Sequence, residues 1–450
     1  MVNISGLRGI VGESLTPEVV VQYASAFAEY CGGGKIILGR DGRSTGKILA
    51  HIASSTLLAA GCDVTAIGVC PTPTVQLAVE HSDVAGGIAI TASHNPMQWN
   101  GMKFIGDHGM FLDAQENNRL QEIAAKQQRL YARWNKMGSH GTDDSWIRKH
   151  VDMILQLPYI QVDQIKKRKF KVVVDCINAA GGVIVPDLLK KLGCTTVEMN
   201  CDISGIFSRN PEPIPENLET LCRRVREEKA NLGIAVDPDV DRLALITEEG
   251  KPFGEEYTIA SAVKFVLQKQ GNIPKPRVVV NLSTTRAVDD IARKFGAEVI
   301  RTPVGDVNVA RKMKDIGAVI GGEGSGGVIL PAVHYGRDAL VGIGLLLQLL
   351  AEFDGTLSEF KASLPQYSIV KSRIEASGAD KTFLKIQQRY RQNGSITTED
   401  GLKIDFPDSW VHLRKSNTEP IIRIIAEAPT QTQAEELVEK FRKEILEKAS

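Results

Sequence analysis

Three aspartates alternate over five residues near the middle of the chain. Asp237, Asp239 and Asp241 lie between two apolar runs, residues 232–236 and 243–246. Carboxylates this close repel one another unless a cation or strong solvation offsets their charge. A hard divalent ion is the economical explanation, and three carboxylates leave open positions, as expected for Mg²⁺ that also binds a phosphoryl oxygen. A merely solvated acidic turn is the alternative.

An EF-hand is a rival interpretation of the same segment. Glu248 falls where a calcium loop has its twelfth ligand. Arg242, however, occupies the position that requires glycine, and residues 243–246 are typical of a strand where ligands are needed. The EF-hand interpretation therefore fails.

A serine and a histidine are neighbours in a second polar loop, TASHNP at residues 91–96. Adjacent side chains on a strand point apart, so Ser93 and His94 cannot be assumed to form a nucleophile and base pair. No Gly-x-Ser-x-Gly pattern surrounds Ser93, which disfavours a serine hydrolase. A metal loop elsewhere would give a serine phosphate its counter-charge, and Lys103 lies close enough in sequence to reach the same phosphoryl group.

A third loop, RKSNTEP at residues 414–420, suits a phosphate oxyanion. It combines the guanidinium of Arg414, the hydroxyls of Ser416 and Thr418 and the amide of Asn417. The spacing is not that of a P-loop. We expect it to hold a phosphate that does not react.

A fourth loop, GGEGSGG at residues 321–327, is rich in glycine. It follows a late strand and carries Glu323 and Ser325, which argues against dinucleotide binding. Glycines permit close backbone approach, and a carboxylate and a hydroxyl two residues apart can bind neighbouring sugar hydroxyls.

The loops at 91, 237 and 321 each end one copy of a unit that recurs three times. Each copy has a strand, a helix, a glycine turn, a strand, and a further strand before the loop. Short valine- and isoleucine-rich strands alternating with helices favour mainly parallel sheets covered on both faces. Ligands gather at the carboxyl ends of such strands, so we expect the loops to face one cleft. Unrelated surface turns are the alternative. The copies begin at residues 35–39, 171–175 and 277–280.

The pattern changes after about residue 370. Short strands at 404–406, 410–414 and 421–425 and an amphipathic helix over 431–448 predict a separate α+β domain. We therefore expect an α/β fold: three similar mixed-sheet α/β domains around a cleft, plus a smaller C-terminal α+β domain. The predicted domains are 1–150, 151–253, 254–368 and 369–450, which carry the serine, metal, sugar and phosphate loops respectively.

Composition limits the partners. At 450 residues the chain exceeds the usual size of one core. The 54 basic and 54 acidic residues balance without blocks of like charge, so we expect no nucleic acid or membrane partner. No apolar run is long enough to span a bilayer, and residues 1–8 lack the basic-then-apolar build of a secretion signal, so we expect a cytoplasmic protein. The seven cysteines are odd in number and form no Cys-x-x-Cys, so we expect reduced core thiols. The oligomeric state is not readable.

With these loops in order, the chain closely resembles the alpha-D-phosphohexomutase superfamily, which includes phosphoglucomutase, phosphomannomutase and phosphoglucosamine mutase. The resemblance covers nearly the whole length. Two further segments match: SGLRG at 5–9, whose Arg8 corresponds to an active-site arginine, and NGMK at 100–103. The four main motifs lie at 91–96, 237–242, 322–326 and 414–420.

The resemblance implies a mechanism. Phosphorylated Ser93 gives its phosphoryl group to a hexose phosphate, forming a bound bisphosphate, and takes it back from the other end. Mg²⁺ on the three aspartates and a phosphoserine oxygen neutralises charge, and a hexose 1,6-bisphosphate acts as activator. Gly327 stands where many relatives carry histidine, which argues against a proton-transfer role for that loop. The general acid and base stay unassigned beyond Arg8 and Lys103. The expected catalytic residues are Ser93, Arg8, His94, Lys103 and Arg242.

The sugar motifs conflict. TPVGD at 302–306 is typical of phosphoglucosamine mutases, whereas RKSNT at 414–418 is typical of phosphomannomutases and phosphoglucomutases. We favour glucosamine phosphate, with glucose or mannose phosphate as the alternative. A magnesium-dependent sugar phosphatase or kinase would need an aspartyl nucleophile or a nucleotide-binding loop, and neither is seen at suitable spacing. An inactive sugar-phosphate binder is the other alternative.

Overall fold

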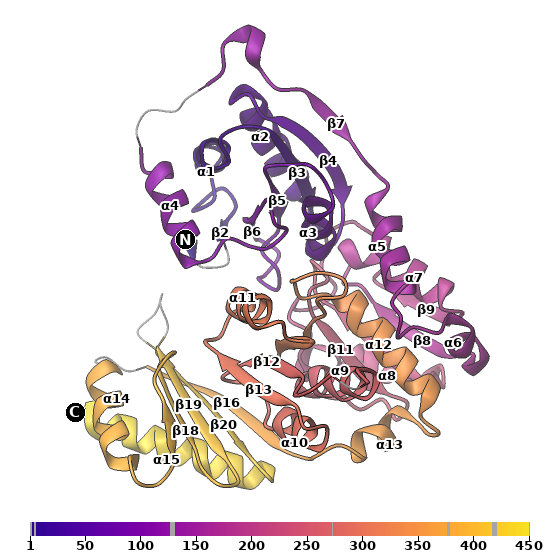
Figure 1. Ribbon diagram of the computed structural model, residues 1–450, viewed down its shortest axis with the longest axis vertical. Helices are drawn as coiled ribbons and strands as arrows, with labels where there is room; N and C mark the ends of the chain where they lie inside the picture. Colours follow the sequence, from indigo (N-terminus) through magenta and orange to yellow (C-terminus); the bar gives the residue numbers. More distant parts are fainter. Residues whose placement is uncertain are drawn as a thin grey trace.

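The computed structural model describes residues 2–3, 6–126, 131–271, 273–375, 379–415 and 421–449, which form four β-sheets (Figure 1). The first three sheets share a four-stranded unit. Three of its strands are parallel, and the fourth, at one edge, is antiparallel. This shared unit confirms the recurring pattern read from the sequence.

The first sheet contains seven strands: β1 (Val2–Asn3), β2 (Gly6–Ile10), β3 (Lys35–Arg40), β4 (Asp63–Val69), β5 (Gly86–Ile90), β6 (Trp99–Gly106) and β7 (His140–Thr142). They lie in the order β1-β2-β6-β5-β3-β4-β7, and β6-β5-β3-β4 is the shared unit. Its helical segments are α1 (Pro17–Tyr30), α2 (Gly46–Ala59), α3 (Thr72–Glu80), α4 (Ala114–Ala124) and the 3₁₀ turn η1 (Trp134–Lys136).

The second sheet has the order β11-β10-β8-β9, built from β8 (Lys171–Asp175), β9 (Thr195–Met199), β10 (Leu232–Val236) and β11 (Leu243–Thr247). Its helical segments are α5 (Trp146–Leu155), α6 (Val162–Arg168), η2 (Ala180–Val183), α7 (Val185–Lys191), η3 (Pro215–Asn217) and α8 (Glu219–Glu227).

The third sheet repeats that order as β15-β14-β12-β13, built from β12 (Arg277–Asn281), β13 (Glu298–Thr302), β14 (Ile320–Glu323) and β15 (Gly327–Ile329). Its helices are α9 (Glu255–Lys269), α10 (Ala287–Lys294), α11 (Asp306–Ile316), α12 (Ala339–Glu352) and α13 (Leu357–Ala362).

The fourth sheet is antiparallel throughout, in the order β16-β20-β19-β18-β17. Its elements are β16 (Ser368–Glu375), α14 (Ala379–Tyr390), β17 (Ser395–Thr397), β18 (Leu402–Asp405), β19 (Trp410–Lys415), β20 (Ile421–Ala428) and α15 (Gln431–Ala449). Helix α15 packs on β16 and β20. The C-terminal α+β domain is therefore confirmed.

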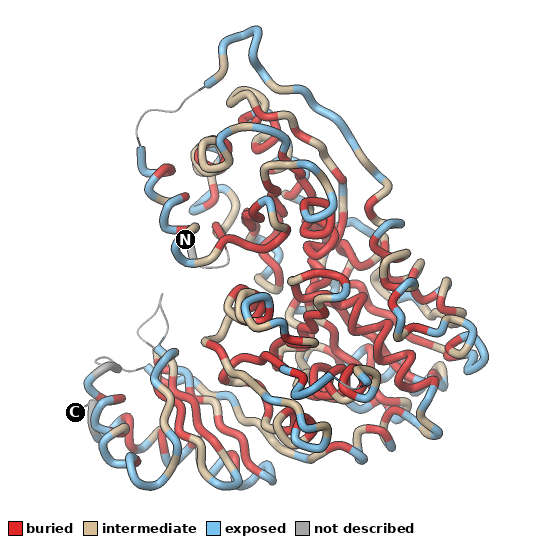
Figure 2. Tube along the Cα trace, in the orientation of Figure 1, coloured by how far each residue is buried: buried red, intermediate tan, exposed pale blue. Residues whose placement is uncertain are grey.

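Burial explains why the strand sequences are so apolar. The central strands have helices on both faces, and Val172, Val173 and Val174 of β8 are all fully buried. Helix α12 is apolar on every side and buried along nearly its whole length, as Figure 2 shows. One continuous core joins the second and third sheets to one face of the first, which holds these three domains together.

The three predicted polar loops occupy one topological place. The loops at 91–96 and 237–242 follow β5 and β10, the third strands of their units, and each leads to the antiparallel strand beside it. The predicted loop at 321–327 is shorter in the structure, because residues 321–323 belong to the third strand β14 and Gly327 begins the antiparallel strand β15. The fold therefore presents each loop at the carboxyl end of a buried strand, where ligands bind in such sheets. The exact domain boundaries stay a proposal. Within the described residues no helix has the length and apolar character of a membrane span.

Candidate active site

Ser93 lies three residues beyond the end of β5, with a φ of +48°. Because this left-handed backbone is not a strand, the alternation of side chains does not apply, and the hydroxyl meets two partners. Ser93 Oγ lies 3.2 Å from Asp237 Oδ2 and 3.2 Å from His94 Nδ1. A positive φ costs a serine on the order of 1 kcal/mol, so surrounding contacts must hold the loop.

Those contacts come from Asp41 and Arg43, which follow β3. Asp41 accepts from Thr91 Oγ1 over 2.7 Å, and Thr91 Oγ1 accepts from the Ser93 amide over 2.9 Å. Arg43 is fully buried and uses all five of its N–H donors. One bonds Asp41, and the others bond the carbonyls of Ser93 (2.6 Å), Asn95 (2.7 Å), Pro96 (2.8 Å) and Trp99 (2.9 Å).

The sequence interpretation missed Asp41 and Arg43. The available signal was their place in the unit, because they follow its first strand at the carboxyl end, beside the strand that carries Ser93. Nothing in the sequence shows that Arg43 points inward.

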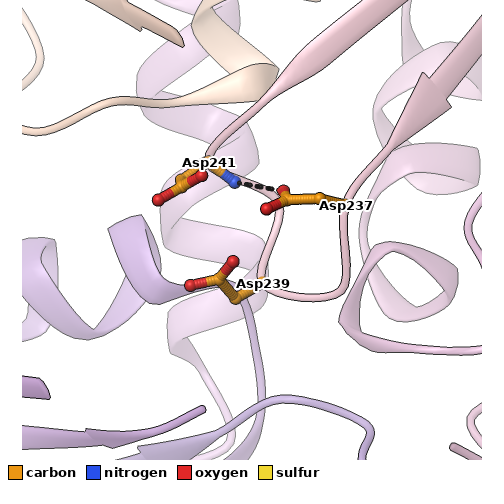
Figure 3. Close-up of side chains that lie close together, drawn as sticks. All are labelled: Asp237, Asp239 and Asp241. Carbon is orange, nitrogen blue, oxygen red and sulfur yellow. Dashed lines mark hydrogen bonds between the residues drawn. The ribbon is translucent and has the colours of Figure 1, made fainter. Parts of the chain in front are cut away.

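Asp237, Asp239 and Asp241 converge as predicted (Figure 3). One carboxylate oxygen from each lies within 4.8 Å of the others, and all three residues are buried. Asp237 Oδ1 accepts hydrogen bonds from the amides of Asp241 (3.1 Å) and Arg242 (3.2 Å). These bonds link the first residue of the 237–242 loop to its last two residues.

Two basic side chains, Lys103 and Arg337, bond the Oδ2 atoms of Asp239 and Asp241. Lys103 Nζ lies 2.6 Å from Asp239 Oδ2 and 3.4 Å from Asp241 Oδ2. Arg337 Nη2 lies 2.7 Å from the same Asp241 oxygen. By contrast, Asp239 Oδ1 and Asp241 Oδ1 are buried and have no hydrogen-bond partner among the described residues. Each of these two carboxylates thus keeps one oxygen for a ligand that the protein itself does not supply.

These free oxygens are the test of whether the site suits Mg²⁺. Mg²⁺ prefers hard oxygen ligands such as carboxylates. The second oxygen of Asp239 and of Asp241 is bonded by other side chains, which fixes the orientation of the carboxylate toward an ion. The residues present therefore fit Mg²⁺.

The pKa shifts follow from burial and the arrangement of charges. Burial and the neighbouring Asp241 and Asp239 carboxylates raise the pKa of Asp237 well above its usual value. Burial alone would also raise the pKa of Asp241, but Arg337 and Lys103 outweigh it and the pKa is lowered. Burial alone would lower the pKa of Lys103, but Asp239 and Asp241 outweigh it and the pKa is raised. Lys103 is therefore an ammonium that offsets charge.

The metal loop is also bonded to the first domain through Thr72. The Thr72 amide donates to the Asp239 carbonyl over 3.0 Å, and Thr72 Oγ1 donates to Asp239 Oδ2 over 2.7 Å. The sequence does not mark Thr72 as a site residue, because a threonine at the start of a helix usually caps that helix.

His94, Arg8 and Arg242 surround the serine and the trio. Burial, together with the positive charges of Arg242 and Arg8, lowers the pKa of His94 well below its usual value, so the imidazole is neutral. Arg8 Nη1 donates to Asn95 Oδ1 in the serine loop over 3.0 Å. Arg242 Nη1 pairs with Glu212 over 3.1 Å.

In the sugar loop, Glu323 is buried and Ser325 is half-buried. Glu323 Oε1 accepts from Asn281 Nδ2 (2.8 Å) and the Gly305 amide (3.0 Å), and Oε2 accepts from Arg337 Nη1 (2.6 Å). Oε2 keeps capacity for one more donor, such as a sugar hydroxyl.

Arg414 lies at the end of β19. Its Nε is 2.8 Å from Asp400 Oδ2, and Asp400 Oδ2 also accepts from the Val304 amide of the third domain over 2.9 Å. Arg414 also lines a cavity of about 470 Å³. Ser416, Asn417 and Thr418 lie outside the described residues.

The fold and site define a class of protein with three related α/β sheets and a serine beside a buried carboxylate trio that fits a metal ion. Family models described as phosphoglucomutase/phosphomannomutase match four successive segments: alpha/beta/alpha domain I over residues 1–130, domain II over 148–250, domain III over 254–367 and the C-terminal domain over 370–444. The chain belongs to the phosphoglucomutase/phosphomannomutase family. It is a phosphohexomutase, as the sequence resemblance implied.

The similar proteins agree in fold and differ in their named sugar. A "Probable phosphoglucosamine mutase" of Methanopyrus kandleri is 37% identical over 97% of this chain and 96% of its own length. A "Phosphoglucomutase/phosphomannomutase" of Thermococcus kodakarensis is also 37% identical, over 96% of each chain. The crystal structure of a phosphoglucomutase/phosphomannomutase family protein from Burkholderia thailandensis matches with a TM-score of 0.87 at 27% identity, covering 99% of this chain and 97% of that one.

Proposed function

We propose that this enzyme interconverts hexose 6-phosphate and hexose 1-phosphate through a phosphorylated Ser93, with glucosamine phosphate as its preferred substrate. The observation that carries the proposal is the 3.2 Å contact between Ser93 Oγ and Asp237 Oδ2. A serine hydroxyl this close to a buried carboxylate trio gains a phosphoryl group only if a cation offsets the added charge.

The site supplies that cation's ligands. Asp237, Asp239 and Asp241, with an oxygen of the phosphoserine, would hold Mg²⁺, which when bound offsets charge on the phosphoryl group during transfer. A fungal N-acetylphosphoglucosamine mutase of the same fold, 14% identical to this chain, has been crystallised with its sugar phosphate and magnesium. The metal assignment here rests on this chain's own buried oxygens.

In the proposed reaction, a hydroxyl of the hexose phosphate attacks the phosphorus on Ser93. The bond from phosphorus to Ser93 Oγ breaks as the bond to the sugar oxygen forms, and the sugar hydroxyl loses its proton. Of the two acid and base candidates named from sequence, Arg8 and Lys103, Lys103 is protonated and stabilises charge. Neutral His94, 3.2 Å from Ser93 Oγ, is proposed in addition as the acceptor of that proton, and the negative charge of the phosphoryl group has to raise its depressed pKa for this transfer. The reverse transfer from the other end of the bisphosphate restores phosphoserine, while Arg242 and Arg8 hold the intermediate.

The remaining loops bind the rest of the substrate. Glu323 and Ser325 are proposed to bind sugar hydroxyls, and Arg414, Ser416, Asn417 and Thr418 the phosphate that does not react. A hexose 1,6-bisphosphate is proposed as the activator that phosphorylates Ser93. On the composition arguments, we also propose a cytoplasmic location without nucleic-acid or membrane partners.

Two sequence segments and the names of the relatives bear on the preferred sugar. The segment at 302–306 and relatives named for glucosamine support glucosamine phosphate. The segment at 414–418 and the Thermococcus relative support glucose or mannose phosphate as the alternative. The test is to compare kcat/KM on glucosamine, glucose, mannose and N-acetylglucosamine phosphates. A higher value for glucose or mannose would overturn the choice of sugar.

A second experiment tests the reaction itself. Intact mass should rise by one phosphoryl group after treatment with a hexose 1,6-bisphosphate, and Ser93→Ala should abolish the increase. An unchanged mass, or an increase that survives Ser93→Ala, would contradict the proposal and favour an inactive binder. Release of inorganic phosphate faster than isomerisation would favour a phosphatase.

A further inference from the structure

Arg337 has a central position that the proposed chemistry does not use. It lies between β15 and α12, and its side chain is 9% exposed. Its guanidinium contacts carboxylates from three different segments. These are Asp241 Oδ2 of the metal loop (2.7 Å), Glu323 Oε2 of the sugar loop (2.6 Å) and Asp306 Oδ2 at the start of α11 (3.5 Å).

The chain makes room for this side chain at one glycine. A Cβ added to Gly327 would lie 2.2 Å from Arg337 Cδ and 2.8 Å from its Cγ, closer than atoms can approach. Gly327 has no positive φ, so its backbone does not require glycine. The absence of a side chain at position 327 is therefore explained by the space that Arg337 occupies.

The backbone next to Arg337 is also firmly held. Asp338 caps α12 by accepting from the Leu340 amide over 2.8 Å, and its other oxygen bonds the buried His150 over 2.7 Å. Because α12 is buried along nearly its whole length, the guanidinium is presented from a rigid support.

We propose that Arg337 is a positioning residue that couples the metal centre to the sugar loop. By bonding Oδ2 of Asp241, it leaves Oδ1 available to a metal ion that the trio would hold, and by bonding Oε2 of Glu323 it orients the carboxylate proposed to bind the sugar. This inference rests on the proposed function of both loops. A planar fork can bond two carboxylates at once, whereas the single ammonium of lysine cannot hold both in the same geometry.

The metal effect separates positioning from simple charge. If Arg337 acted only through its charge, its removal would take away a positive charge that repels a divalent ion, so the ion would bind more tightly. Loss of a residue that orients a metal ligand typically weakens metal affinity about 10- to 100-fold. The two explanations thus predict opposite directions for the same variant.

The experiment is Mn²⁺ titration of the full-length chain without sugar, with kcat and KM measured on the preferred hexose phosphate. Arg337→Gln should weaken Mn²⁺ binding about 10- to 100-fold and raise the hexose-phosphate KM. Arg337→Lys should recover part of the Mn²⁺ affinity while the KM stays raised. Arg311→Gln, which removes another arginine of the third domain that pairs with a carboxylate, here Glu116 of the first domain, is the matched control and should change neither value.

Tighter or unchanged Mn²⁺ binding in folded Arg337→Gln would overturn the inference. If that variant does not fold, Gly327→Ala tests the same point, because its methyl group displaces Arg337; Gly141→Ala, at a position with no atom within 4 Å, is its control. Unchanged Mn²⁺ affinity in Gly327→Ala would then contradict the inference. If Asp239→Asn leaves Mn²⁺ binding intact, the proposed metal centre itself is wrong.

Discussion

The guanidinium of Arg43 donates a hydrogen bond to the backbone carbonyl of Ser93 over 2.6 Å. Ser93 has a left-handed backbone, and the same guanidinium bonds three more carbonyls of its loop. The direction in which the serine hydroxyl points is therefore set by an arginine fifty residues away, in the loop that follows β3.

Replacement of Arg43 by lysine should misplace this loop. Lysine keeps the charge beside Asp41 but offers three donors where Arg43 uses five, so two carbonyls lose their partner inside the protein. Each buried carbonyl left unbonded costs roughly 1–3 kcal/mol. We expect a lower melting temperature and little phosphorylation of Ser93 by a hexose 1,6-bisphosphate, measured by intact mass. Arg40→Lys, which removes one partly buried arginine bond nearby, should phosphorylate normally. Normal phosphorylation of Arg43→Lys would show that the loop at 91–96 keeps its conformation without the hydrogen bonds of Arg43.

Loss of the proposed nucleophile or of a proposed metal ligand should remove most activity while the chain stays folded. Ser93→Ala deletes one hydroxyl, and Asp239→Asn keeps the shape of the side chain but removes its charge. Lys103 retains Asp241 as a partner in the second variant. We expect mutase rates to fall about a hundredfold or more, because the trio acts as a unit. Thermal melts check the fold: a large drop in melting temperature would mean that these residues serve structure first.

A methyl group at Gly101 should destabilise the first domain. The added Cβ would lie 2.2 Å from the Leu7 carbonyl oxygen and 2.8 Å from that of Thr91, both backbone atoms that cannot rotate away. Overpacking of this kind typically costs about 1–3 kcal/mol. We expect Gly101→Ala to lower the free energy of unfolding by that amount in urea titrations. Gly141→Ala, at an open position, should change it little. Equal stabilities for the two variants would contradict this account.

Acid should weaken the junction between the third and fourth domains. Burial lowers the pKa of His412 to about 4. Its Nδ1 lies 2.8 Å from Ser283 Oγ and its Nε2 lies 2.6 Å from the Asp400 carbonyl oxygen. Between this pKa and the ordinary value for histidine, the unfolded chain binds a proton that the folded chain does not, so stability falls as pH falls through that window.

The size of this effect follows from the shift. Between pH 7 and pH 5 it amounts to about 2 kcal/mol of unfolding free energy. His412→Gln carries no titrating ring, so its loss of stability over the same range should be smaller by that amount. Melting curves at pH 7 and pH 5 for both proteins provide the comparison. An identical pH dependence would exclude His412 as the cause.

The sequence by itself determined the repeated unit, the order of the four loops and the chemistry of the groups they carry. Asp237, Asp239 and Asp241 stand so close in the chain that their mutual repulsion predicts a cation without any knowledge of the fold. The apolar strand before each loop predicts its place at a strand's carboxyl end, because that periodicity is local.

Tertiary structure alone decided which distant groups surround those loops. Arg43 lies 50 residues from the Ser93 carbonyl, Thr72 lies 167 residues from Asp239, and Arg337 lies 96 residues from Asp241. In the chain each is an ordinary polar residue beside a strand or a helix. The reach of Arg337 to both Asp241 and Glu323 follows from the packing of α12 into the shared core and from the space left at Gly327. Such contacts arise when non-adjacent segments fold together, so no local pattern encodes them.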